Sequence, residues 1–131
     1  MLHIRLHGAP CNVRLDNGKV MSGKKAADHL AKTIKATGNS PINFVSCYGA
    51  AGGAISNAQM LANKTGCPVK GYTKKISPVQ AGNNSHAGKS RVFHPQSPLK
   101  AKVCGITNQT AGSLIQPGMH AYNFLRTHLH P

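Results

Sequence analysis

Apolar and polar residues alternate at the start of the chain. The segment Leu2-His3-Ile4-Arg5-Leu6-His7 places every second side chain on one face, which predicts a strand over 2–7. A turn is expected next at His7-Gly8-Ala9-Pro10, since Gly and Pro favour turns. Residues 12–15 and 19–21 then flank Asp16-Asn17-Gly18, which is a hairpin signal.

The apolar period changes from two to about 3.6 after this hairpin. Residues 22–37 predict a helix, with Ser22 as its N-terminal cap and Gly38 at its end. Three further elements are expected: a buried strand over 42–46, a helix over 55–64 and a strand over 68–72. Strands that alternate with helices predict right-handed crossovers and a parallel sheet.

The predicted fold is α/β, a single small domain with a mainly parallel central sheet flanked by helices. Its core covers about 2–95 of the domain 1–131, and 96–131 form an irregular C-terminal extension. Beyond the third core strand we expect a surface loop over 80–89, strands over 91–93 and 101–106 that can be antiparallel, and a short helix over 120–127. Because the chain begins inside a predicted strand, we expect a piece of a larger protein or one delivered by another component.

The charge of the chain is unusual. Sixteen Lys and Arg face two acids, Asp16 and Asp28, for a net charge of +14. Such a field attracts nucleic acid, anionic membrane, an acidic partner or an acidic substrate. Nucleic acid is not favoured, since the bases are dispersed from Arg5 to Arg126 and few aromatics could stack on bases. No stretch approaches the ~20 apolar residues of a membrane span.

The cysteines give no metal-site signal. Cys11, Cys47, Cys67 and Cys104 lack C-x-x-C spacing, so a zinc ribbon or thioredoxin-like site is disfavoured and no metal is predicted. Two disulfides in an oxidising compartment and buried free thiols both remain open.

The Gly-rich segment 49–53 can hold a phosphate before a helix, but it is not G-x-G-x-x-G, and no cofactor is expected.

His7 and Cys47 form the candidate reactive site. Both lie just past the carboxyl ends of parallel core strands, the edge where open α/β sheets place their sites. A thiol next to an imidazole is a minimal unit for covalent catalysis, and backbone amides at Gly8 and after Cys47 can donate to an oxyanion. The alternative is a buried Cys47 and a turn residue at His7. Four residues can border a pocket, although packing or capping also explains them: Ser46, Tyr48, Gly49 and Gln59.

Several short motifs together resemble a known toxin domain. His7-Gly8 after a strand, Phe44-Val45-Ser46-Cys47 and then Asn57-Ala58-Gln59-Met60-Leu61-Ala62 are similar to the C-terminal domains of polymorphic toxins, including Rhs/YD-repeat and Tc toxins. The likeness continues through 64–69 and 92–95, so it covers about residues 2–95. The order His-Gly then Ser-Cys is also similar to the caspase-like cysteine peptidases.

The resemblance implies a caspase-like strand order and a cysteine peptidase-like hydrolase. His7 would accept the proton, Cys47 would be the nucleophile, and the Gly8 and Cys47 amides would bind the oxyanion. Two features depart from the pattern: the loop after Cys47 is unusually small, and no local acid obviously orients His7.

We therefore expect a toxic effector domain released from a larger secreted toxin and delivered into the target-cell cytoplasm, where it acts on a protein substrate. An acidic immunity protein or an encapsulating toxin shell would be its other partners. Two alternatives stay open: a cationic, non-proteolytic effector that binds nucleic acid or a host filament, and a nucleotide- or NAD-using modifying enzyme.

Overall fold

The main sheet of the domain has four strands in the order β1-β5-β6-β7. The computed structural model describes residues 2–34, 40–76 and 89–129, with side chains through Ile115. The strands are β1 (Leu2–Arg5), β5 (Ile42–Val45), β6 (Val69–Tyr72) and β7 (Ser90–Phe93). Strands β1, β5 and β6 are parallel and β7 is antiparallel to β6, which confirms the predicted α/β fold with a mainly parallel sheet.

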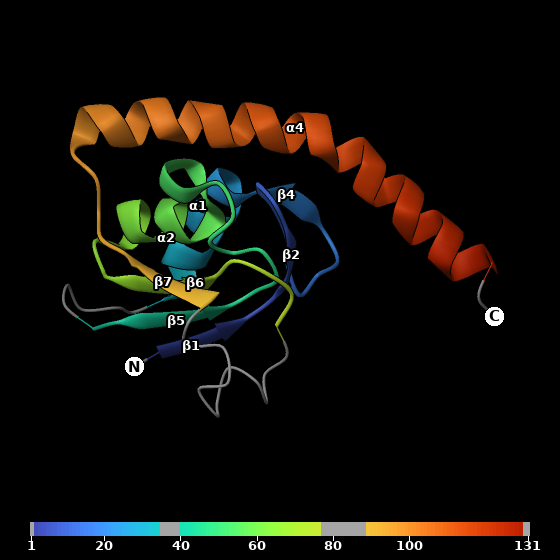
Figure 1. The fold of residues 1–131 in the computed structure, drawn as a ribbon, viewed down its shortest axis with the longest axis horizontal. Helices are drawn as coiled ribbons and strands as arrows, with labels where there is room; N and C mark the ends of the chain where they lie inside the picture. The colour runs from blue at the N-terminus through green and yellow to red at the C-terminus, as the bar shows by residue number, and fades with distance from the viewer. Residues whose placement is uncertain (1, 35–39, 77–88, 130–131) are drawn as a thin grey trace.

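Two helices cover one face of this sheet, and a third lies over them (Figure 1). They are α1 (Gly23–Thr33), α2 (Asn57–Thr65) and the long α4 (Pro98–Leu129), with a 3-10 turn η1 (Gly53–Ile55) before α2. Apolar side chains of the sheet fill the space beneath α1 and α2, where Ile42, Phe44 and Val69 are buried. The core therefore lies between the sheet and this pair of helices.

The start of α1 and both ends of α2 follow local sequence signals, whereas α1 ends at Thr33, with Ile34 extended, before the predicted end at 37. Ser22 caps α1 by accepting a hydrogen bond from the Lys25 amide, and Ser56 caps α2 in the same way through the Gln59 amide. Gly66 ends α2 with a φ of 73°, a left-handed conformation that glycine adopts without strain. Residues 35–37 of the predicted first helix, like 80–88 of the predicted loop, lie outside the described residues.

A second, smaller sheet contains the hairpin. It orders β2 (His7–Ala9), β3 (Asn12–Arg14) and β4 (Val20–Ser22), all antiparallel, so the predicted hairpin is confirmed. The single strand predicted over 2–7 is wrong, because the chain changes sheet at Leu6. The Leu6 amide still donates to the Val45 carbonyl at 3.1 Å, and His7 then pairs with Arg14. Alternation along one segment cannot show that its two ends pair with different neighbours.

The C-terminal prediction is also wrong. Residues 98–129 are one helix, so the irregular extension and the strand over 101–106 are wrong, while the helix predicted over 120–127 is part of this longer helix. The segment reads as a strand because Val103 and Ile106 are apolar, but both point to solvent, and the helix packs through small residues instead. Gly112, for example, lies so close to the Cys11 carbonyl that a Cβ would be 2.5 Å from that oxygen.

Three buried asparagines join these layers. Asn57 donates from its amide nitrogen to the carbonyls of Ala9 and Asn12, each at 3.0 Å. Asn108 of α4 donates to the Ile55 carbonyl at 2.7 Å, and Asn12 donates to the Gly112 carbonyl at 2.9 Å. The turn that follows β2 is thereby held by both α2 and α4.

No helix within the described residues is long and apolar enough to cross a membrane.

Candidate functional site

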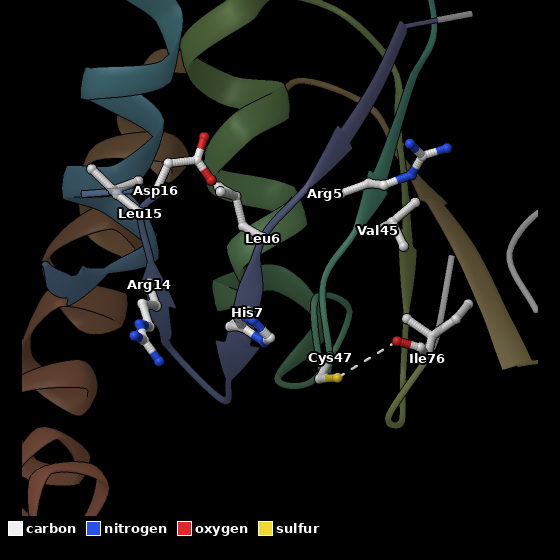
Figure 2. Close-up of a pocket in the computed structure, with 9 residues that line it drawn as sticks. All are labelled: Arg5, Leu6, His7, Arg14, Leu15, Asp16, Val45, Cys47 and Ile76. Atoms are coloured by element: carbon white, nitrogen blue, oxygen red, sulfur yellow. Dashed lines mark hydrogen bonds between the residues drawn. The ribbon is translucent and has the colours of Figure 1, made fainter. Parts of the chain in front are cut away.

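A cavity of about 430 Å³ opens where β1 gives way to β2 and β5 ends. Figure 2 shows the side chains that surround it, which come from the two sheets and from the segment after β6. The lining residues are Arg5, Leu6, His7, Arg14, Leu15, Asp16, Val45, Cys47 and Ile76. The two residues predicted to react, His7 and Cys47, therefore face one common cavity.

The backbone brings these two residues together. The hydrogen bond from Leu6 to Val45 extends the parallel pairing of β1 and β5 past the sheet edge. One residue later the chain touches the end of β5, since a Cβ on Gly8 would overlap the Ser46 hydroxyl and lie 2.8 Å from the Cys47 carbonyl oxygen. A side chain at position 8 would push the segment carrying His7 away from Cys47.

The thiol of Cys47 is turned toward the other wall of the cavity. Its Sγ donates a weak hydrogen bond to the Ile76 carbonyl at 3.8 Å, as the dashed line in Figure 2 marks. Within the described part of the chain, no hydrogen bond joins this thiol to the His7 imidazole. His7 is exposed and Cys47 half-buried, so both are open to a molecule entering the cavity.

Cys47 differs from the other three cysteines in accessibility. All four are free thiols, but Cys11, Cys67 and Cys104 are buried. Burial raises the pKa of the Cys11 thiol, because the apolar surroundings disfavour its charged form. The two disulfides left open by the sequence are not formed, and Cys47 is the thiol that a reagent can reach.

The turn after Cys47 is tight. Tyr48 adopts a φ of 59°, which is uncommon for a residue other than glycine. Its amide donates to the Lys74 carbonyl at 3.1 Å, and the Gly49 amide donates to the Ser46 carbonyl at 3.1 Å. Within the described residues neither the Cys47 amide nor the Gly52 amide of this turn has a backbone acceptor, so the Cys47 amide is a candidate donor to an oxyanion.

The four residues proposed to border the pocket do not contribute to its lining. Ser46 is buried against Gly8, and its Oγ has no hydrogen-bond partner among the described residues. Tyr48 forms the turn, and Gly49 packs against the Phe44 ring. Gln59 lies in α2 and donates to the His94 carbonyl at 2.7 Å, which ties β7's end to that helix.

Sequence reasoning missed the charged residues of the cavity. Arg5 and Arg14 are exposed and line it, together with Asp16, which had been given only a turn-forming role. The available signal was the turn near Pro10, because the strands on its two sides, β2 and β3, pair Arg14 with His7. Two guanidinium groups against one carboxylate make the cavity favourable for anions.

No group of three or more metal-ligating side chains occurs in the described ranges.

Comparison with known proteins identifies relatives along nearly the whole chain. A family model described as "Secreted effector protein SteB" matches residues 1–128. The proteins of that name from Salmonella typhimurium strains 14028s and LT2 are each 39% identical over 124 residues, which cover 93% of this chain and 90% of theirs. No solved structure is a significant match.

These matches correct the toxin-domain resemblance. The chain matches a different family, and no Rhs/YD-repeat or Tc toxin domain is found, so the likeness of the short His-Gly and Ser-Cys strings was misleading. The strings His7-Gly8 and Ser46-Cys47 each lie where a strand gives way to a turn, and small residues are common at turns in unrelated folds. The expectation of a secreted effector is confirmed by the family's description.

Proposed function

Since this chain belongs to the SteB family of secreted effector proteins, we propose that it acts in a target cell as a thiol-dependent hydrolase whose nucleophile is Cys47 and whose base is His7. The observation that supports this most is the shared cavity of about 430 Å³ that both residues line. Cys47 is the accessible thiol of the four, and it sits at the sheet edge where α/β proteins place their sites.

The reaction begins when the Cys47 thiol leaves the Ile76 carbonyl and turns to His7. The weak 3.8 Å bond to Ile76 offers little resistance to this rotation. The imidazole accepts the thiol proton while the sulfur forms a bond to the acyl carbon of the substrate. In this proposal the Cys47 and Gly8 amides donate to the oxygen of the tetrahedral centre as it forms.

The remaining steps restore the enzyme. The bond from the acyl carbon to the leaving oxygen or nitrogen breaks, and the leaving group takes the proton from the imidazolium. Water then adds to the thioester and gives a proton to His7, and this proton returns to the sulfur as the carboxylic acid departs. No further reactant is required.

The charge of the cavity favours a substrate with an anionic group near the bond that is attacked. Arg5 and Arg14 both line the cavity, and Asp16 is the acid among its lining residues. Because Arg presents a planar fork of donors, it binds carboxylate or phosphate well. The preference for an anion follows from side chains of the site itself rather than from the net charge of the whole chain.

Acylation by two activated esters tests this proposal. Nitrophenyl acetate is neutral and nitrophenyl succinate is anionic, and both release coloured nitrophenolate. We expect nitrophenolate release with an acyl adduct on Cys47 in the mass spectrum, faster with the succinate, and no adduct in Cys47→Ala. The matched control Cys104→Ala removes a buried thiol and should keep the activity. Equal release by Cys47→Ala would contradict the hydrolase.

The second candidate is a cationic effector that binds an acidic target without chemistry. Its support is the net charge of +14, with bases distributed along the whole chain. The two candidates differ in what Cys47→Ala does to target cells. A folded Cys47→Ala protein that retains its full effect would favour the binding effector, whereas loss of the effect would favour the hydrolase.

A further inference from the structure

The outward face of α4 carries large apolar side chains. Four residues form what we call the outer stripe, and their exposed fractions are 75% for Leu99, 56% for Val103, 60% for Ile106 and 79% for Leu114. At 3.6 residues per turn they fall within an arc of about 80°. α4 is the outermost layer of the domain (Figure 1), and the exposure of these four side chains puts the stripe on the outward side of the helix.

The inward face of the same helix has the opposite character. Its buried residues are small or polar: Cys104, Gly105, Asn108 and Gly112. Asn108 accepts from the Lys24 amide at 2.9 Å and donates to the Ile55 carbonyl, and the glycines let the helix approach the domain closely. A surface helix normally turns its large apolar residues inward. Here the domain holds α4 by hydrogen bonds and close contact, which leaves its apolar residues for another molecule.

The spacing of the stripe is that of a helix seam. Val103 follows Leu99 by four residues and Ile106 follows Val103 by three, as in a heptad repeat. Thr110 continues the line, and its hydroxyl donates back to the Ile106 carbonyl at 2.9 Å, so its polar group is already paired. An apolar arc this narrow is typical of packing against a single helix.

The charge beside the stripe selects the partner. Lys100 and Lys102 flank it on either side, and the sequence of α4 contains no acid. A second copy would set lysine against lysine, since Asp16 and Asp28 are the acids of the chain and Asp28 already pairs with Lys24 and Lys64. Helices that lie on membranes use wide apolar faces with aromatic residues, and the segment 99–114 has no aromatic residue.

We propose that the outer stripe of α4 docks an acidic amphipathic helix of a partner protein. The partner's apolar seam would cover Leu99, Val103 and Ile106, and Asp or Glu beside that seam would face Lys100 and Lys102. The stripe is exposed on α4, and no residue of α4 lines the cavity of Cys47. The proposal therefore stands whether or not Cys47 is a nucleophile.

A pair of synthetic peptides tests this proposal with the full chain. Both are heptad peptides of about 28 residues with Leu and Ile in the seam, one with Glu at the flanking positions and the other with Lys. Fluorescence anisotropy should show that the Glu peptide binds at least about tenfold more tightly than the Lys peptide. The Lys100→Glu/Lys102→Glu variant should reverse this preference.

Matched substitutions show whether the stripe is the site. The double variant Val103→Ser/Ile106→Ser should weaken binding of the Glu peptide by about tenfold or more. The control Val92→Ser removes a side chain that is 58% exposed on β7, close to the 56% of Val103, and should not change the affinity. Circular dichroism should show that these variants keep their helix content.

Three results would overturn the proposal. Failure of the full chain to bind either peptide would mean that the stripe is no docking surface for a helix. A concentration-dependent dimer in sedimentation that Val103→Ser/Ile106→Ser abolishes would make a second copy the occupant. Binding to phosphatidylserine vesicles that the same double variant abolishes would assign the stripe to a membrane.

Discussion

Gly8 lies directly against the carbonyl oxygen of Cys47, and a Cβ on Gly8 would come within 2.8 Å of that oxygen. This contact joins the second sheet to the end of β5 and sets His7 beside the cavity that Cys47 lines. His7 and Cys47 can thus lie close together because Gly8, which has no side chain, allows the two segments to touch.

Gly8→Ala should destabilise the protein and disturb the site. The new methyl group would overlap the Ser46 hydroxyl and the Cys47 carbonyl, and overpacking of this kind costs about 2–3 kcal/mol. Urea denaturation should show this loss, and alkylation of Cys47 in the folded protein should change in rate. Gly18→Ala is the control, because nothing lies within 4 Å of Gly18. It adds only a left-handed alanine at about 1 kcal/mol and should leave Cys47 alkylation unchanged.

Asn57→Asp should be more destabilising than its small change in shape suggests. The Asn57 amide donates to two backbone carbonyls, of Ala9 and Asn12, in the buried interior. Aspartate cannot donate to either and would set its charge beside them, which should cost about 3 kcal/mol or more in urea denaturation. Asn17→Ala removes an exposed turn contact to the Lys19 amide and should cost less than about 1 kcal/mol. Similar losses in the two variants would contradict the role given to Asn57.

Cys11 should make stability fall in alkaline solution. Burial raises the pKa of its thiol above the ordinary value of 9.0 in the folded state only, so the unfolded chain loses this proton first. The stability that the buried, protonated thiol contributes is fully present below the pKa of the unfolded chain. It is lost as the pH rises from that value through the folded pKa. Between the unfolded and folded pKa values the loss is about 1.4 kcal/mol per pH unit, and Cys11→Ala should lack it. Parallel stability curves for the two proteins above pH 9.0 would refute this assignment.

Native thiol accessibility should single out Cys47. It is half-buried, while Cys11, Cys67 and Cys104 are buried, so a thiol reagent should label one site in the folded protein and four after denaturation. Peptide mapping by mass spectrometry identifies the labelled residue. Labelling of Cys104 at the rate of Cys47 would show that α4 separates from the domain in solution.

Local patterns determined most of the sheet and helices but not their long-range partners. Ser22 marked the start of α1 correctly, because a cap depends on neighbours a few residues away. The change of sheet at Leu6 depends on β3 and β5 and could not be seen in residues 2–7 alone. α4 was misjudged because its apolar residues face solvent while Gly105 and Gly112 face the domain, which reverses the usual pattern.

The pair His7 and Cys47 could be predicted from local patterns, but the charged residues of the cavity could not. His7 and Cys47 follow strand ends, and parallel pairing alone brings such ends to one edge. Arg5 and Arg14 enter the cavity through their places in two different sheets, which no single motif records. The excess of Arg over Asp in this cavity was therefore hidden in a general excess of basic residues.

Alkylation of Cys47 by iodoacetamide at neutral pH, with and without His7, tests the central claim most directly. If His7 accepts the thiol proton, the folded protein should react faster than N-acetylcysteine, and His7→Gln should slow Cys47 by about tenfold or more. His29→Gln, which changes an exposed histidine of α1, should have no effect. A Cys47 that reacts at the same rate in the unchanged protein and in His7→Gln would contradict the pairing of these two residues.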